Sequence, residues 1–324
     1  MSESRFTRFT WAVLATNLAV ILWGAFVRAT GSGAGCGNNW PTCNGEIIPR
    51  SPSVETLIEL THRLTSGIAL ILVVVLAVWA RRLYGSGHRV RRAAAWTLGF
   101  MLGEAAIGAG IVLFELVADN ESMARALFMA VHLGNTFFLL AANTVTAYWA
   151  GGGPSIELRG HGHRLRLVVA SLVGTLLIGI SGAVAALGDT LFPATSLGEA
   201  IQQDLSPTSH VLIQLRISHP VIAVLVSLLL LHFIATLRKT RGQPTVRRYA
   251  NRLNLLIFVQ VTAGAVNIIL LAPVWMQLLH LLLADLLWIT LVLTCAACLA
   301  VTEAAPAASA RPRSPRTEPT AVEA

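Results

Sequence analysis

The stretch Glu55–Gly67 reads E-T-L-I-E-L-T-H-R-L-T-S-G and opens a long apolar run. Within it, Glu59, His62 and Arg63 fall where the chain should already lie inside a membrane. Glu59 and His62 are three residues apart, so on a helix they share one face. Ionisable groups cost free energy in a bilayer and usually mark a functional site. The stretch therefore predicts a membrane helix that carries a site.

The composition of the 324-residue chain indicates a polytopic membrane protein. Hydrophobic residues make up 55% of it and charged residues 12%, against about 25% charged in soluble domains. The mean hydropathy is +0.67. The net charge of +8 is confined to loops, where it fits membrane topology better than nucleic-acid binding. We therefore expect a lipid bilayer around the chain and no nucleic-acid partner.

Apolar runs long enough to cross a bilayer, which requires about 20 residues, predict the fold class. It is an all-α polytopic membrane protein with eight transmembrane helices. The first run is followed by no typical cleavage site, so we expect it to be retained rather than removed as a signal peptide. The runs lie at about 11–27, 55–80, 93–115, 123–149, 165–187, 208–236, 249–271 and 274–301.

Lys and Arg residues are divided unequally between the two sides of this layout. With the N-terminus inside, 19 of the 24 lie in inner segments and five in outer ones. Because positive residues favour the cytoplasmic side, we expect both termini to be cytoplasmic. The preference for Arg and Ala over Lys, with no transit peptide, favours a bacterial plasma membrane over a mitochondrion.

A weak internal repeat divides the spans into two halves. Matching residues recur at offsets between 148 and 157: His62 with His219, His132 with His280, and Glu104-x-x-x-Gly108 with Gln260-x-x-x-Gly264. Such a parallel repeat predicts two four-helix bundles related by an axis along the membrane normal. The expected parts are residues 1–150 with an extracytoplasmic loop at 28–54, residues 151–301, and a disordered cytoplasmic tail at 302–324.

Four histidines in alternate spans lie at similar depth: His62, His132, His219 and His280. They fall roughly 10–18 Å below the outer ends, at about 1.5 Å per residue. Facing helices of a bundle build cofactor sites from such side chains. Two imidazoles suit a six-coordinate heme, whereas zinc or copper would require three or four ligands per site. We therefore expect each half to bind one heme, with isolated hydrogen-bonding histidines as the alternative.

Arginines also gather near the outer surface, where Lys and Arg are otherwise scarce. Arg28, Arg63 and Arg216 are the candidates for binding the propionates of an anionic cofactor. Snorkelling to lipid headgroups stays open as the alternative. Pro220 directly follows His219 and predicts a kink in that span, because proline cannot donate the helical hydrogen bond.

The four cysteines fall into two pairs. Cys36 and Cys43 lie in the first outer loop, on an oxidising side of the membrane, so a structural disulfide is favoured over a metal site or a redox pair. Cys295 and Cys298 lie near the inner end of the last span, where packing is the expected role.

Two stretches resemble the heme A synthase family. They are G-A-F-V-R-A-T-G-S-G-A-G-C-G-N-N-W-P-T-C-N-G at Gly24–Gly45 and E-T-L-I-E-L-T-H-R at Glu55–Arg63. The resemblance also covers the eight-span layout and the four histidines, and its specific motifs lie in the first half. It implies an oxidoreductase that converts heme O to heme A, for terminal oxidase assembly, by oxidising a methyl group to a formyl group.

The resemblance also implies roles for individual residues. His62 and His132 would bind heme O and its product heme A, and His219 and His280 would be the axial ligands of a heme b. Glu59 would be the catalytic carboxylate, with a salt bridge to Arg63 or Arg28 as the structural alternative. The chain departs from the family at residues 34–41, A-G-C-G-N-N-W-P instead of the common L-G-C-P-D-W-P, and at Glu104, where a glutamine is expected.

The expected partners are a heme O synthase and an electron acceptor, and the sequence leaves a homo-oligomer open. Two other classes of function stay open. A quinone-linked diheme b-type electron carrier would hold two equivalent permanent hemes, and Glu59 would be dispensable. A transporter with two repeats would place its site at the midplane, but the polar residues here lie toward the outer surface.

Overall fold

The computed structural model describes residues 3–239 and 244–300. In this part of the chain all regular structure is helical, and β-pairing is limited to isolated bridges. The helices are α1 (Glu3–Ala29), η1 (Ser32–Ala34, a 3₁₀ turn), α2 (Val54–Leu83), α3 (Arg89–Leu113), α4 (Met123–Ala150), α5 (Gly162–Leu191), α6 (Leu197–Leu205), α7 (Val211–Arg216), α8 (Ser218–Lys239), α9 (Pro244–Ile269) and α10 (Val274–Cys298).

The predicted fold class is confirmed. Among the described residues, eight segments are long and apolar enough to cross a membrane, with α7 and α8 counted as one segment. Apolar side chains on the outside of the bundle, such as Val224, Leu225 and Leu228 of α8, are more than half exposed. A bilayer removes the cost of this exposure, so the chain is a multi-pass membrane protein. The predicted tail at 302–324 lies outside the described residues.

Two spans differ in detail from the predicted ones. The first helix begins at Glu3 rather than near residue 11, because a helix can continue past the apolar run that hydropathy detects. The sixth span is interrupted at Ile217, between α7 and α8. Pro220 has no N–H for the carbonyl of Arg216, so the predicted kink is confirmed as a break.

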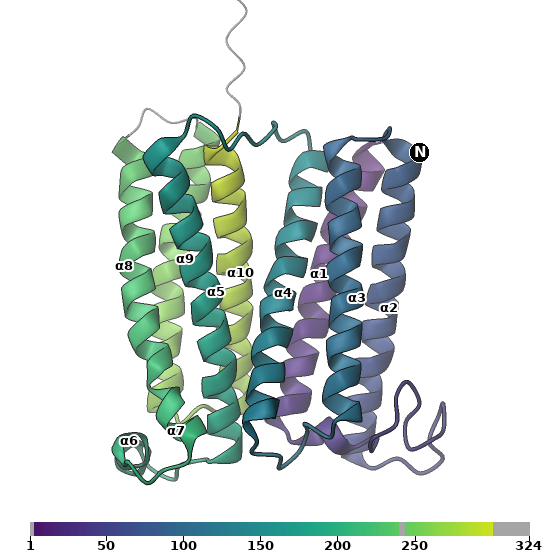
Figure 1. The fold of residues 1–324 in the computed structure, drawn as a ribbon, viewed down its shortest axis with the longest axis vertical. Helices are drawn as coiled ribbons and strands as arrows, with labels where there is room; N and C mark the ends of the chain where they lie inside the picture. The colour runs from purple at the N-terminus through teal and green to yellow at the C-terminus, as the bar shows by residue number, and fades with distance from the viewer. Residues whose placement is uncertain (1–2, 240–243, 301–324) are drawn as a thin grey trace, which may run out of the picture.

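Helix α6 was not predicted, since the segment 188–207 was expected to be a loop. It is short and carries several polar residues, so it gives no signal of a membrane span. Ser196 begins it as an N-cap, accepting a hydrogen bond from the backbone N–H of Glu199 at 3.2 Å. In Figure 1 it lies at the same end of the molecule as α7, across the end of the bundle.

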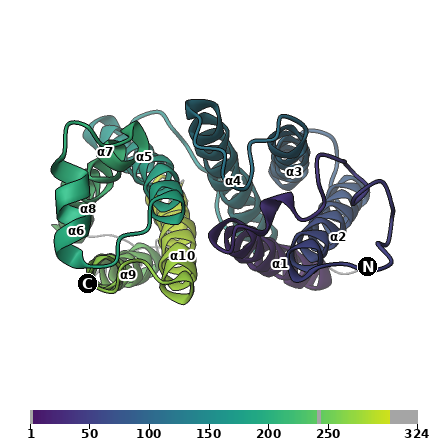
Figure 2. The same cartoon turned by 90° about the horizontal axis from the view of Figure 1, so that it is seen from below.

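The helices form two groups that lie side by side. Figure 2 shows α1–α4 in one group and α5, α8, α9 and α10 in the other, with α1, α4, α5 and α10 along the seam between them. The beginning of α1 and the end of α10 lie at one end of the molecule in Figure 1, opposite α6. This grouping agrees with the two predicted halves. The repeat that relates them and the side that faces the cytoplasm stay predictions.

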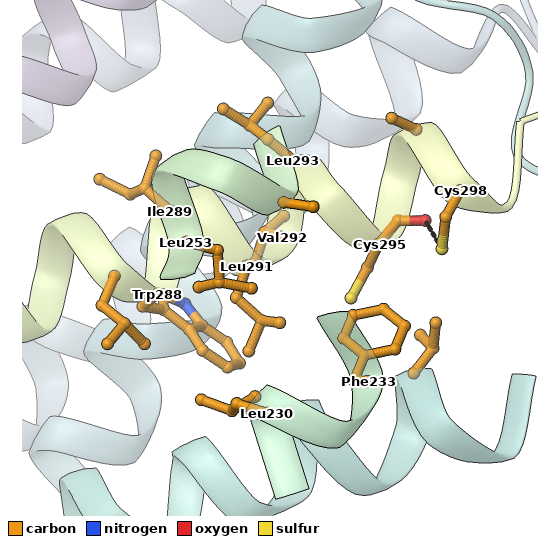
Figure 3. Packing of buried hydrophobic residues seen from close by; sticks show 14 of the residues in the cluster. Leu230, Phe233, Leu253, Trp288, Ile289, Leu291, Val292, Leu293, Cys295 and Cys298 are labelled. Atoms are coloured by element: carbon orange, nitrogen blue, oxygen red, sulfur yellow. Dashed lines mark hydrogen bonds between the residues drawn. The ribbon is translucent and has the colours of Figure 1, made fainter. Parts of the chain in front are cut away.

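The largest buried cluster surrounds α10 (Figure 3). Trp288 stacks on Phe137 of α4 with ring centres 4.9 Å apart, and its Nε1 donates to the backbone carbonyl of Phe137 at 2.7 Å. Cys295 and Cys298 belong to the same cluster and are buried, as expected for a packing role. Because α4 and α10 belong to different groups, Trp288 joins the two groups across the seam.

Replacing this tryptophan is expected to loosen the seam. Trp288→Ala should lower the free energy of unfolding by about 3–5 kcal/mol, because a large buried side chain is removed. Chemical unfolding in detergent micelles measures this. Trp275 lies in the first turn of α10 and is 60% exposed, so Trp275→Ala is the matched control and should be nearly neutral. Equal losses in the two variants would contradict the assigned role of Trp288.

Candidate functional site

The four predicted histidines lie on four different helices, two in each group. His62 is on α2 and His132 on α4. His219 is on α8 and His280 on α10. All four side chains are half-buried. Each helix group thus holds two of the four histidines, and both their pairing and their role as iron ligands stay predictions.

The second pair has a ring spacing that one iron between the two imidazoles could accommodate. The ring centres of His219 and His280 are 6.4 Å apart, and the ring planes are nearly perpendicular at 88°. Imidazole nitrogens bind a metal at about 2.0–2.1 Å, so two imidazoles on opposite sides of one metal have ring centres roughly 6 Å apart. The residues present thus fit the two axial positions of a heme.

Polar neighbours surround this second pair. Oγ of Ser181, on α5, is 3.1 Å from Nδ1 of His219. A contact at Nδ1 fixes the ring and leaves Nε2 for a metal. Nε2 of Gln260 is 3.3 Å from Nε2 of His280, and Nδ1 of His280 is buried with no hydrogen-bond partner among the described residues. The ring of His219 is therefore held through Nδ1, whereas the polar contact of His280 is at Nε2, the nitrogen that a metal would also require.

In the first group, Glu104 of α3 reaches His132. Its Oε2 lies 3.0 Å from Nδ1 of His132, at ion-pair distance but without the alignment of a hydrogen bond. Its Oε1 accepts from Nδ2 of Asn135 at 2.6 Å and from Oγ1 of Thr136 at 3.1 Å. A carboxylate beside the far nitrogen of a histidine orients the ring and strengthens it as a metal ligand. Glu104, where a glutamine was expected, thus contacts a predicted ligand.

Glu59 is 3% exposed and has partners at both carboxylate oxygens. Its Oε1 accepts from Nη2 and Nε of Arg63 at 2.5 and 3.1 Å. Its Oε2 accepts from the backbone N–H of Cys36 at 2.8 Å. The structural alternative, a salt bridge to Arg63, is therefore present. A catalytic role of Glu59 stays a prediction.

The first outer loop is held against α2 by these same groups. Cys36 and Cys43 form the predicted disulfide. Nη1 of Arg63 donates to the backbone carbonyls of Asn39 and Thr42 at 2.6 and 2.7 Å. Two residues of the motif E-x-x-H-R therefore attach the loop to α2. Glu59 and Arg63 bind the disulfide loop, and His62 lies between them in the sequence.

Arg28 makes its contacts with the other helix group. Its Nη1 donates to the carbonyl of Ala186 and to Oγ1 of Thr190 on α5, both at 2.6 Å. Its Nη2 donates to Oε1 of Gln277 on α10 at 2.8 Å. Gln277 lies three residues before His280. Arg28 therefore links α1 to two helices that surround the second histidine pair.

Arg216 is paired with two carboxylates. Its Nε donates to Oδ1 of Asp204 at 2.8 Å, and its Nη1 donates to Oδ1 of Asp189 at 3.0 Å. Sequence reasoning missed both aspartates, because their spacing along the chain gives no sign that they meet. Each of the three predicted propionate-binding arginines thus has protein partners, and propionate binding stays a prediction.

Two further features of the described residues bear on the kind of site. No group of three or more His, Cys, Asp or Glu side chains there has the arrangement of a metal-ion site. A hollow of about 390 Å³ lies at the end of the seam where α4 ends, lined in part by Trp11, Tyr148 and Tyr249. Tyr148 lies roughly 24 Å along α4 from His132, at about 1.5 Å per residue. The hollow is therefore not part of the histidine sites.

Comparison with known proteins gives a family match and several relatives. The family model COX15-CtaA, described as cytochrome oxidase assembly protein, matches residues 7–292. A Thermus thermophilus protein named protoheme IX farnesyltransferase is 50% identical over 289 residues, which cover 89% of this chain and 48% of that protein. A Bacillus mycoides protein named heme A synthase is 43% identical over 107 residues, 32% of this chain and 34% of that protein. The chain thus spans about half the length of the Thermus relative.

Arg63 provides a direct test of how the loop is held. Arg63→Ala leaves the buried carboxylate of Glu59 without its ion pair, which should cost about 3–5 kcal/mol of stability. It also removes the donors to the loop carbonyls, so cleavage of residues 30–53 by added protease should become faster. Arg50 is exposed in the same loop, and Arg50→Ala is the control. Unchanged protection of the loop in Arg63→Ala would contradict the interpretation.

Proposed function

Because the chain belongs to the COX15-CtaA family of cytochrome oxidase assembly proteins, we propose that it is a heme A synthase. The proposed reaction oxidises a methyl group of heme O to a formyl group, giving heme A. The relatives named heme A synthase support this proposal, although they match about a third of the chain. The unequal surroundings of the two histidine pairs support it further.

The observation that carries the proposal is the difference between the two pairs. The ring centres of His219 and His280 lie 6.4 Å apart, and neither ring has a carboxylate partner among residues 3–239 and 244–300. On the other side of the seam, His132 has the carboxylate of Glu104 at 3.0 Å. A carrier with two equivalent hemes would have no need for this difference. We assign heme b to His219 and His280, and heme O and then heme A to His62 and His132.

The chain's own residues orient these groups. The bound hemes supply the redox chemistry. Ser181 would orient His219 and Glu104 would orient His132, each from the Nδ1 side, which would leave Nε2 of both rings for iron. Glu59 precedes His62 by about one helical turn, so we assign it as the catalytic carboxylate, which stabilises positive charge on the reacting carbon. Arg28, Arg63 and Arg216 lie at the same end of the bundle as candidates for the propionates.

The reaction also requires partners. Oxidation of a methyl group to a formyl group needs an electron acceptor and a source of oxygen. A heme O synthase is the proposed supplier of substrate, and the name of the Thermus relative, protoheme IX farnesyltransferase, describes farnesyl transfer to heme. We place the protein in a bacterial plasma membrane with both termini in the cytoplasm. Residues 1–150 would carry the substrate site and residues 151–301 the heme b site.

Heme extraction and chromatography on the purified chain tests this function. The native chain should contain heme b together with heme O or heme A. Glu59→Gln removes the charge at nearly constant size and should trap heme O or a hydroxylated intermediate. Glu55 is an exposed carboxylate on the same helix, so Glu55→Gln is the matched control and should resemble the native chain. Heme b as sole pigment, unchanged by Glu59→Gln, would instead indicate an electron carrier.

Single histidine substitutions test the assignment of the two hemes. His280→Ala should remove low-spin heme b from the absorption and electron paramagnetic resonance spectra while heme O or heme A is retained. His62→Ala should have the opposite effect. Loss of both hemes in either variant, in protein that still elutes as a folded species, would argue against separate sites.

A further inference from the structure

In the described part of the chain, three of the four predicted ligand histidines pack directly against a glycine of a neighbouring helix. A Cβ atom added to Gly24 of α1 would lie 2.8 Å from Cε1 of His62. One added to Gly182 of α5 would lie 3.0 Å from Cε1 of His219, and one on Gly264 of α9 would lie 3.0 Å from Cε1 of His280. We call Gly24, Gly182 and Gly264 the glycine seats.

Each glycine seat limits the movement of its ring on the side that faces the glycine. Protein interiors are close-packed, so a ring this near to a helix backbone has little freedom to move toward it. An alanine in the same place would push the ring away, because carbon atoms make their best contacts at about 3.5–4.0 Å. Because these three positions are glycines, the three imidazoles can lie close to the neighbouring helix backbone.

His132 is the exception. In sequence, Gly108 stands four residues after Glu104 as Gly264 stands four residues after Gln260. Yet a Cβ on Gly108 would meet nothing within 4 Å, whereas one on Gly264 would meet His280. His132 lies instead beside Glu104, at 3.0 Å, and 29% of its side chain is exposed. The ring of His132 is therefore not held by a glycine.

This difference matches the different demands on the two proposed heme sites. A permanent heme is best held by two fixed ligands, as His219 and His280 are. A substrate heme must enter and its product must leave, so both histidines of that site must be able to release the iron, one of them before the other. The ring of His62 packs against the backbone at Gly24, whereas the ring of His132 has no such glycine and is positioned by its contact with Glu104, so His132 has more room to move.

We propose that His132 is the exchangeable axial ligand of the substrate site and that Glu104 positions its ring in the released state. The inference rests on the proposed function, because it assumes a substrate heme at His62. If a heme were held by His62 and His132, Nε2 of His132 would release the iron and keep the electron pair that it had shared. Nδ1 remains beside Glu104, so neither electrons nor protons leave the chain.

Cyanide, a small ligand of ferric heme, measures this exchange without reference to turnover. It is added to the oxidised, heme-loaded protein, and the low-spin signals of the two hemes are followed by absorption and electron paramagnetic resonance. In the native chain we expect cyanide to replace an imidazole at the substrate heme while heme b is unchanged. A response of both hemes, or of neither, would overturn the proposal.

Two matched glycine variants test the seats. Gly264→Ala should displace His280 and make heme b respond to cyanide as well. Gly108→Ala is the same substitution at the corresponding position of the other group. It should keep the native response, because a Cβ there meets open space. An unchanged heme b in Gly264→Ala, or an equal effect of Gly108→Ala, would contradict the role of the seats. If Gly264→Ala does not fold, Gly182→Ala applies the same test to His219.

The heme content of each preparation separates the two levels of the proposal. A heme-containing preparation in which neither heme O nor heme A is found would count against the proposed function itself. Two hemes present with the wrong pattern of cyanide binding would count against the inference about His132 and leave the proposed function standing.

Discussion

The ion pair between Glu59 and Arg63 is the contact on which the outer end of the first helix group depends. A charge inside a bilayer has no water to solvate it, so it persists where protein groups surround it. Here the backbone N–H of Cys36 binds the carboxylate, and the carbonyls of Asn39 and Thr42 bind the guanidinium. The loop is thereby fixed over α2, whose His62 lies between the two charged residues. Loop conformation and ligand position are thus parts of one hydrogen-bonded unit.

A second unit connects the two helix groups. Arg28 extends from the end of α1 to carbonyl, hydroxyl and amide oxygens on α5 and α10. The same helix, one turn earlier, carries Gly24 against the ring of His62. The contacts of one helix therefore reach the surroundings of both histidine pairs. At the middle of the seam, Trp288 and Phe137 add a stacked and hydrogen-bonded contact.

Hydropathy predicted the spans because a bilayer imposes a minimum length on an apolar helix, and the oxidising compartment predicted the disulfide of Cys36 and Cys43. The depth of the histidines followed from helical rise. The partners of Arg28 and Arg216 could not be predicted, because they come from helices far away in the sequence and no spacing rule relates them. Nothing in the sequence indicated that the surroundings of His132 and His280 differ. Glu104-x-x-x-Gly108 and Gln260-x-x-x-Gly264 read alike, and their difference arises from side-chain packing.

The seam between the two groups has a consequence for how such a chain can evolve. In a symmetric homodimer of four-helix subunits, one gene specifies both copies, so every substitution occurs twice. Joining two such units in one polypeptide, as the predicted repeat implies, removes this restriction. One copy can then acquire a carboxylate at Glu104 while the other keeps an amide at Gln260. Covalent linkage thereby allows the two copies of a cofactor-binding unit to differ. In the proposed function, one copy binds a permanent heme and the other binds a heme that is converted to product.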